Sequence, residues 1–210
     1  MNNYSWLQQK LHQIALSSQF MREVTFDVEN SIVSMKKSYE DHVFVSGLAR
    51  SGTTILLNAL YQSSEFASLS YKDMPFVLAP NLWSKLSLKI KDIDTAERAH
   101  GDGIKVSADS PEAFEEVFWM TFDNDDKDTR EKFKNYVQLI NQKYHKKRYL
   151  SKNNQNIRRV EFISKIFPNS KILITFRNPI QHAYSLLSQH KKFIEDSNKD
   201  KFISNYMKWI

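Results

Sequence analysis

The chain has 210 residues, of which 41% are hydrophobic and 26% charged, a composition typical of one soluble globular domain. It has no cysteine, which excludes disulfide bonds and thiolate metal sites and suits a reducing compartment. The formal net charge of +6 suits polyanionic ligands, but the basic run 143–148 is typical of a solvated helix face, and no zinc pattern or aromatic-interleaved basic stretch indicates nucleic-acid binding.

The N-terminal segment predicts an amphipathic helix rather than a targeting or membrane-spanning segment. Apolar residues recur at nearly helical spacing over 5–20, so we expect residues 1–40 to form a helical segment packed on the domain. Residues 1–6 lack the basic and apolar regions of a signal peptide, and no run reaches the roughly 18 apolar residues of a membrane span. We therefore expect a cytoplasmic protein, with membrane-surface attachment as the alternative.

A strand, a glycine loop and a helix are predicted in succession over residues 42–61. The apolar run 42–46 leads into a loop from Gly47 to Thr54, and a helical run follows. The N–H groups of a helix's first turn have no partner within the helix, so they can bind an anion. The spacing of Gly47 and Gly52 is that of a P-loop, but Thr53 occupies the place of the lysine that binds the β- and γ-phosphates. The loop therefore predicts a site for a nucleotide without a triphosphate tail.

Short apolar runs alternate with helical patterns along the rest of the chain. Such alternation predicts an α/β fold, with a parallel sheet flanked by helices and ligands bound at the carboxyl ends of the strands. Pro80 is expected to kink or split the predicted helix 75–90, and Ser110 to cap the predicted helix 111–120. We expect strands at 66–70, 104–106 and 171–176, and helices at 75–90, 111–120, 129–147, 153–167 (Ile157, Val160, Ile163 and Phe167 inward) and 179–193.

Three segments together resemble the sulfotransferases that use 3′-phosphoadenylyl sulfate (PAPS). Residues 50–54, Arg-Ser-Gly-Thr-Thr, resemble the family's 5′-phosphosulfate-binding loop. Residues 177–179, Arg-Asn-Pro, with Ser185 eight residues after the arginine, resemble its 3′-phosphate-binding motif. Residues 150–154, Leu-Ser-Lys-Asn-Asn, are similar to its lysine-bearing turn. The motifs occur in the family's order and spacing, and the set is most similar to bacterial members near the carbohydrate and tyrosylprotein branches.

This resemblance implies a P-loop NTPase-like three-layer sandwich and an enzyme that moves a sulfuryl group from PAPS to an acceptor hydroxyl, with PAP as the product and no metal required. It implies that Arg177 and Ser185 bind the 3′-phosphate and that Lys152 steadies the leaving group. The position one turn after Ser185, which is basic in some relatives, is Gln189 here. The residues implied for the 5′-phosphosulfate are Arg50, Ser51, Gly52, Thr53 and Thr54.

The residue that takes the acceptor proton has several candidates. Asp73 occupies a place similar to that of a glutamate in tyrosylprotein sulfotransferases, although a capping role for the helix at Pro75 competes with it. His100 is the alternative, because many cytosolic sulfotransferases use a histidine. A third set of candidates consists of Glu112, Glu115 and Glu116.

The acidic residues and the glycine loop have two alternative interpretations, a metal site and a P-loop kinase. His100, Asp102 and Asp109 would make a metal set, but the predicted strand 104–106 separates Asp109 from the other two. A P-loop small-molecule kinase would need a lysine directly after Gly52 and an acid that binds Mg²⁺, and neither is evident.

The acceptor implied by the resemblance is a sugar hydroxyl of a surface polysaccharide or glycolipid, beside segment 109–119. The chain stops inside an amphipathic pattern at 206–210, whereas sulfotransferases usually continue further. We therefore expect the sulfotransferase domain 41–210 to be incomplete at its C-terminus, and a non-catalytic or degenerate PAP-binding fragment remains an alternative function.

Overall fold

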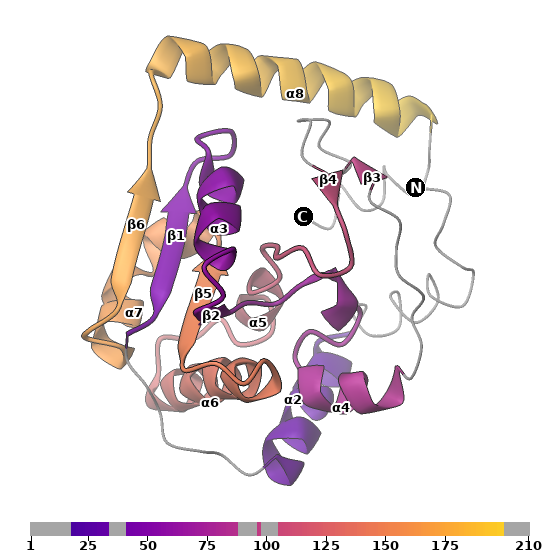
Figure 1. The fold of residues 1–210 in the computed structure, drawn as a ribbon, viewed down its shortest axis with the longest axis vertical. Helices are drawn as coiled ribbons and strands as arrows, with labels where there is room; N and C mark the ends of the chain where they lie inside the picture. The colour runs from indigo at the N-terminus through magenta and orange to yellow at the C-terminus, as the bar shows by residue number, and fades with distance from the viewer. Residues whose placement is uncertain (1–17, 34–40, 88–95, 98–104, 200–210) are drawn as a thin grey trace.

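The computed structural model describes residues 18–33, 41–87, 96–97 and 105–199. Figure 1 shows the arrangement of the elements, with α8 lying across the end of the sheet toward which the strands point. In chain order they are α2 (Gln19–Ile32), β1 (Val43–Gly47), α3 (Thr53–Tyr61), β2 (Phe66–Ala67), the 3-10 helix η1 (Tyr71–Asp73), α4 (Pro80–Leu86), β3 (Ala96–Glu97), β4 (Lys105–Val106), α5 (Glu116–Trp119), α6 (Lys127–Lys143), β5 (Arg148–Lys152), the 3-10 helix η2 (Asn154–Arg158), α7 (Val160–Ile166), β6 (Lys171–Thr175) and α8 (Pro179–Lys199).

A four-stranded parallel sheet in the order β2-β5-β1-β6 forms the centre of the fold. All five residues of β1 are buried, as expected of a strand covered on both faces. Val43 and Val45 pack with Leu57 of α3 on one face. Phe44, between them, points to the other face, where it meets the rings of Phe133 in α6 and Phe167 after α7. Helices thus cover both faces, and the predicted three-layer α/β fold is confirmed.

The strand predictions are confirmed for β1 and β6. Of the predicted strand 66–70 only Phe66–Ala67 forms β2, and β4 lies within the predicted strand 104–106. β4 pairs antiparallel with β3 and takes no part in the central sheet. The sequence pattern does not predict β5, because Arg148 and Ser151 interrupt its apolar positions and Lys152 ends it. It is nevertheless a central strand, paired with both β1 and β2.

The predicted helix 75–90 is wrong in its first five residues, because α4 begins at Pro80. Proline is favoured at the first helical position, where its missing N–H costs no intrahelical bond, so Pro80 starts the helix rather than kinking it. The fully buried carboxylate of Glu29, on α2, accepts from the backbone N–H groups of Asn81 and Leu82 at 2.8 and 2.9 Å. A side chain from a distant helix therefore caps α4.

Two other predicted helices are shorter in the structure. Of 111–120 only Glu116–Trp119 is α-helical, and Pro111 instead forms a β-bridge with Ser70. Ser110 does not cap that helix, since its Oγ accepts from the N–H of Ser107. The predicted helix 153–167 is divided into η2 and α7, and its supposedly inward Ile157 is 48% exposed.

The predicted helix 129–147 is present as α6, with shifted ends. The side chain of Asp126 caps its start, and the positive φ of His145, +52°, follows its end. Residues 5–17 of the predicted helix 5–20 lie outside the described residues. Ser18 caps α2, which begins at Gln19. That helix was not predicted separately, and it places Phe26 against the rings of Phe118 and Phe122.

Candidate active site

The loop between β1 and α3 packs closely against the end of β6. Gly47 has a φ of +145°, and a Cβ there would lie 2.5 Å from Thr175 Oγ1 and 2.8 Å from Ser51 Oγ. The hydroxyls of Ser51 and Thr175 are 2.6 Å apart, and the Ser51 N–H donates to the Leu48 carbonyl at 3.1 Å. Glycine is therefore required at Gly47 both for its backbone conformation and for the space its hydrogen leaves.

The start of α3 presents backbone donors beside this loop. Its N-cap is Gly52, with a φ of +99°, and glycine has no side chain that could accept from the first-turn N–H groups. The carbonyl of Gly52 accepts a helical hydrogen bond from the Leu56 N–H, at 3.1 Å. Thr53 and Thr54 are buried in the first turn. The positive end of a nine-residue helix thus lies where the sequence predicts a phosphate.

The loop is joined directly to α8, which carries the second predicted phosphate motif. The Arg50 Nε–H donates to Ser185 Oγ at 3.1 Å, across 135 residues of sequence. Asn178 caps α8, since its Oδ1 accepts from the N–H groups of Ile180 and Gln181 at 3.1 and 3.2 Å. The structure therefore brings together Arg50 and Ser185, which the sequence assigns to opposite ends of one nucleotide.

His182 is a residue of this region that the sequence motifs do not reveal. Its Nε2 lies 2.6 Å from the Ala49 carbonyl oxygen, and because a carbonyl only accepts, Nε2 carries the proton and donates. The side chain is buried, one turn before Ser185 on the same helix. Residues three apart on a helix lie on the same face, so the spacing of His182 and Ser185 in the sequence could have indicated that both face the loop.

Arg177, the predicted 3′-phosphate ligand, is exposed at the junction of β6 and α8. Within the described part of the chain, no hydrogen bond or ion pair of its guanidinium is seen. Its planar guanidinium can therefore donate to a phosphate. It lies at the same end of the strands as the loop between β1 and α3.

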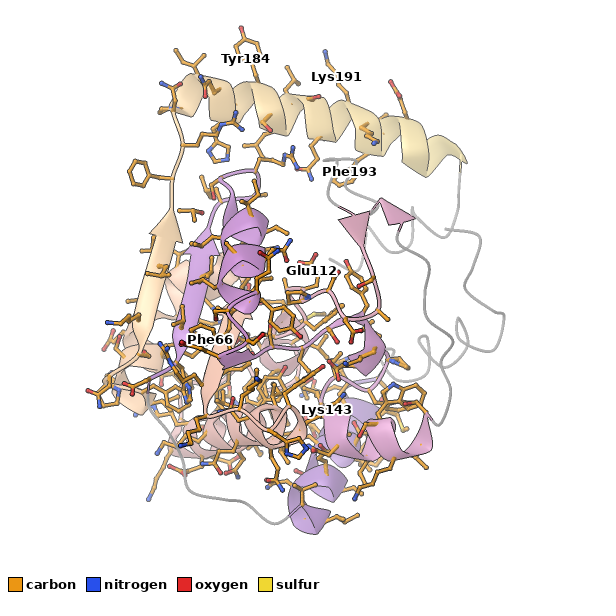
Figure 2. All side chains as sticks on the ribbon, in the orientation of Figure 1. Phe66, Glu112, Lys143, Tyr184, Lys191 and Phe193 are labelled. Atoms are coloured by element: carbon orange, nitrogen blue, oxygen red, sulfur yellow. The ribbon has the colours of Figure 1, made fainter. Side chains whose placement is uncertain are left out.

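Lys152 is the last residue of β5 and lies in register with Val45, two residues before Gly47. Its side chain is about nine-tenths buried, and its Nζ forms an ion pair with Glu112 Oε1 at 3.1 Å. The Glu112 N–H donates to the Leu69 carbonyl at 3.2 Å, which holds this residue beside the extension of β2. Figure 2 shows Glu112 near the middle of the molecule, beside α3 in this view.

The other two glutamates of that segment hold the fold together. Glu115 is 2% exposed and accepts from Tyr149 OH and Trp119 Nε1, each at 2.9 Å. Burial, and then the charge of Glu115, raise the pKa of Tyr149, so its phenol stays protonated and donates. Glu116 accepts two bonds from the Arg159 guanidinium, at 2.9 and 3.0 Å.

Asp73 is fully buried and has a dense set of partners. Its Oδ2 accepts from the Ser70 N–H at 2.7 Å and from the Tyr144 hydroxyl at 2.5 Å, and its Oδ1 pairs with Lys143. It closes a capping box around η1 rather than capping a helix at Pro75. Burial, and then the charge of Asp73, raise the pKa of Tyr144, which keeps that hydroxyl a donor. These contacts give Asp73 a structural role, and its predicted role as the base remains a prediction.

The remaining predicted residues lie elsewhere. His100 and Asp102 lie outside the described residues, and Asp109 forms an exposed ion pair with Lys72 at 2.5 Å. In the described ranges no group of three His, Cys, Asp or Glu side chains could hold a metal ion. A hollow of about 420 Å³ lies between α2, α4 and the end of α6, and it includes Lys143 but none of the predicted nucleotide ligands.

A family model described as the sulfotransferase family matches residues 42–209, a range that begins at β1 and includes the loop, Lys152, Arg177 and Ser185. The chain belongs to this sulfotransferase family. The resemblance recognised in the three motifs is thereby confirmed. Among the described residues, no helix is long and apolar enough to cross a membrane.

The chain is similar to two solved structures. Sulfotransferase STF1 from Mycobacterium tuberculosis H37Rv is 16% identical, with a TM-score of 0.49, over 83% of this chain and 56% of that one. Sulfotransferase STF9 from Mycobacterium avium is 17% identical, with a TM-score of 0.48, over 89% of this chain and 56% of that one. The match thus spans about 56% of the length of each. No curated protein matches the chain significantly.

Proposed function

We propose that this sulfotransferase moves a sulfuryl group from PAPS to an acceptor hydroxyl, with PAP as the product. The observation that carries the proposal is the contact between Arg50 and Ser185, which unites two phosphate motifs that are far apart in the sequence. Both motifs follow carboxyl ends of neighbouring parallel strands, β1 and β6, where ligands of such sheets bind.

Each described residue then has a task in binding the donor. The first-turn N–H groups of α3, with the hydroxyls of Thr53 and Thr54, hold the 5′-phosphosulfate. Arg177 and Ser185 hold the 3′-phosphate. As the acceptor oxygen bonds to sulfur, the bond from sulfur to the 5′-phosphate oxygen breaks, and its electron pair remains on that oxygen. Lys152, at the end of β5, neutralises the charge that develops there.

The acceptor in this proposal is a sugar hydroxyl of a surface polysaccharide or glycolipid. The support is the likeness of the motifs to the carbohydrate and tyrosylprotein branches of the family. Transfer of ³⁵S from labelled PAPS to hexose oligosaccharides, compared with simple phenols and tyrosine peptides, tests it. Labelling of phenols alone would contradict the sugar acceptor.

The nucleotide site is tested by thermal stabilisation of the purified chain with PAP, AMP, or ATP plus Mg²⁺. A ligand that binds only the folded state at a hundredfold excess over Kd adds about 2.7 kcal/mol to the free energy of unfolding. We expect this gain with PAP, and we expect Arg177→Ala to remove most of it. Lys171→Ala, an exposed cation at the opposite end of β6, is the matched control and should leave the gain unchanged.

Three results would contradict the proposal. Cooperative unfolding with no response to PAP would show that the chain has no PAP site. A response to ATP plus Mg²⁺ that exceeds the response to PAP would favour a P-loop kinase. Stabilisation by PAP without any sulfuryl transfer would instead favour a non-catalytic PAP-binding protein.

His182→Ala should weaken PAP binding about three- to tenfold, since a net hydrogen bond contributes about 0.5–1.5 kcal/mol. The loss follows because the Ala49 carbonyl no longer anchors the loop to α8. Titration calorimetry with PAP measures the effect, and His190→Ala, an exposed histidine of the same helix, is the control. Equal PAP affinity in wild type and His182→Ala would show that the loop needs no support from α8.

A further inference from the structure

We infer that Glu112 is the catalytic base that takes the proton from the acceptor; this inference rests on the proposed sulfuryl transfer. Glu112 lies close to the predicted reaction site. Glu112 Oε1 lies 3.1 Å from the Nζ of Lys152, the residue placed at the leaving phosphate oxygen. Lys152 in turn lies in register with Val45, just before the phosphate loop. The Glu112 carboxylate is therefore one ion-pair length from the group that meets the reacting phosphosulfate.

The Glu112 carboxylate is accessible, and its backbone is fixed. The side chain of Glu112 is 12% exposed, so it is sheltered from bulk water yet not sealed. Its N–H is bonded to the Leu69 carbonyl, and the preceding Pro111 is bridged to Ser70, so the residue is fixed along the extension of β2. A base must be both positioned and able to touch the acceptor, and this carboxylate meets both conditions.

The other candidate carboxylates are bonded to groups that hold the fold together. Asp73 is fully buried and bonded to Ser70, Lys143 and Tyr144. Glu115 is 2% exposed and held by two aromatic donors, and Glu116 accepts a two-bond guanidinium contact. Using any of these as a base would break a contact that the fold needs. Glu112 pairs with a cation that the reaction itself engages, and its carboxylate also accepts from the Ala113 N–H at 2.9 Å and from the Tyr71 hydroxyl at 3.4 Å.

The reaction then redistributes one ion pair. The negative phosphosulfate attracts the Lys152 ammonium, which leaves the Glu112 carboxylate to accept the hydrogen bond of the acceptor hydroxyl. As the new oxygen–sulfur bond forms, the hydroxyl proton passes to Glu112. The electron pair of the broken sulfur–oxygen bond remains on the 5′-phosphate oxygen of PAP, beside Lys152. Glu112 returns the proton to water after the products leave, and the ion pair forms again.

Single-turnover release of PAP from PAPS tests this inference, with water as the first acceptor and a pool of hexose oligosaccharides as the second. We expect PAP to form from PAPS faster with the wild-type protein than in buffer without protein. This rate should fall in acid, because the base becomes protonated. Glu112→Gln should lower that rate about 10²- to 10⁴-fold and abolish its fall in acid. The amide still accepts from Lys152 but carries no counter-charge for it, so both proteins are compared at a temperature where urea unfolding shows them folded, and PAP affinity should change little. Asp73→Asn is the comparison for the rival base.

The outcomes separate this inference from the proposed function. An unchanged rate and pH profile in Glu112→Gln would overturn the inference while leaving the PAP site intact. A large rate loss in Asp73→Asn, with normal stability, would also overturn it. If wild type binds PAP but does not accelerate PAP release with either acceptor, no base operates and the inference fails. If wild type does not bind PAP at all, the proposed function fails, and the inference fails with it.

Discussion

Asp73→Ala is expected to lower the free energy of unfolding by about 3–5 kcal/mol, the cost of removing one partner of a buried ion pair. Asp73 is fully buried, and its partner Lys143 has a side chain only 10% exposed. The substitution leaves that ammonium without its counter-charge. It also takes the acceptor from the Ser70 N–H and from the Tyr144 hydroxyl, whose raised pKa keeps it protonated. Urea unfolding of the two proteins measures the difference.

Asp109→Ala is the matched control for this prediction. Asp109 also pairs with a lysine, Lys72, but the aspartate side chain is 69% exposed. An exposed ion pair contributes about 0–1 kcal/mol, so the control should unfold almost as wild type does. If Asp73→Ala were as stable as wild type and lost only sulfuryl transfer, the structural role of Asp73 would be wrong. The predicted role of Asp73 as the base would then be supported.

The strand–loop–helix unit and β6 are predictable because their signals are local. β1 is buried on both faces, which gives a continuous apolar run, and the glycines of the loop meet conformations that other residues avoid. β5 carries no such signal. Only Tyr149 and Leu150 are apolar among its five residues, and its strand state depends on pairing with β1 and β2.

The errors in the helix predictions have causes that lie far away in the sequence. α4 begins at Pro80 because Glu29, on another helix, supplies acceptors to its first N–H groups. The segment after Ser110 follows β2 rather than forming a helix, because Pro111 bridges to Ser70. The apolar spacing over 75–90 and 111–120 therefore correctly predicted that each range contains a helix. Long-range contacts determined where each helix starts.

The candidate site divides in the same way. The residues proposed to bind phosphate, from Arg50 to Thr54 and around Arg177, belong to short motifs that are visible in the sequence. The pairs His182 with Ala49 and Glu112 with Lys152 join residues 133 and 40 positions apart. Neither pair has a local signal of its own, so each required the fold.

Gly47→Ala is expected to abolish stabilisation by PAP and to lower the free energy of unfolding by about 3–5 kcal/mol, combining backbone strain with overpacking. The added Cβ would lie 2.5 Å from Thr175 Oγ1 and 2.7 Å from the Thr175 backbone oxygen. The hydroxyl can rotate away, but the backbone oxygen belongs to β6, so the loop itself must move. A displaced loop no longer aims the first turn of α3 at the phosphosulfate. Urea unfolding and PAP calorimetry measure the two effects.

Gly52→Ala separates the two causes of this loss. Gly52 also has a positive φ, +99°, but nothing lies within 4 Å of the position that a Cβ would take. The variant should therefore suffer only backbone strain, of about 1–3 kcal/mol, and keep part of its affinity for PAP. The difference between the two variants measures the contribution of the close approach of β6 to the loop. Equal losses would contradict this account, because they would show that the backbone conformation alone, and not the contact with Thr175, fixes the phosphate loop.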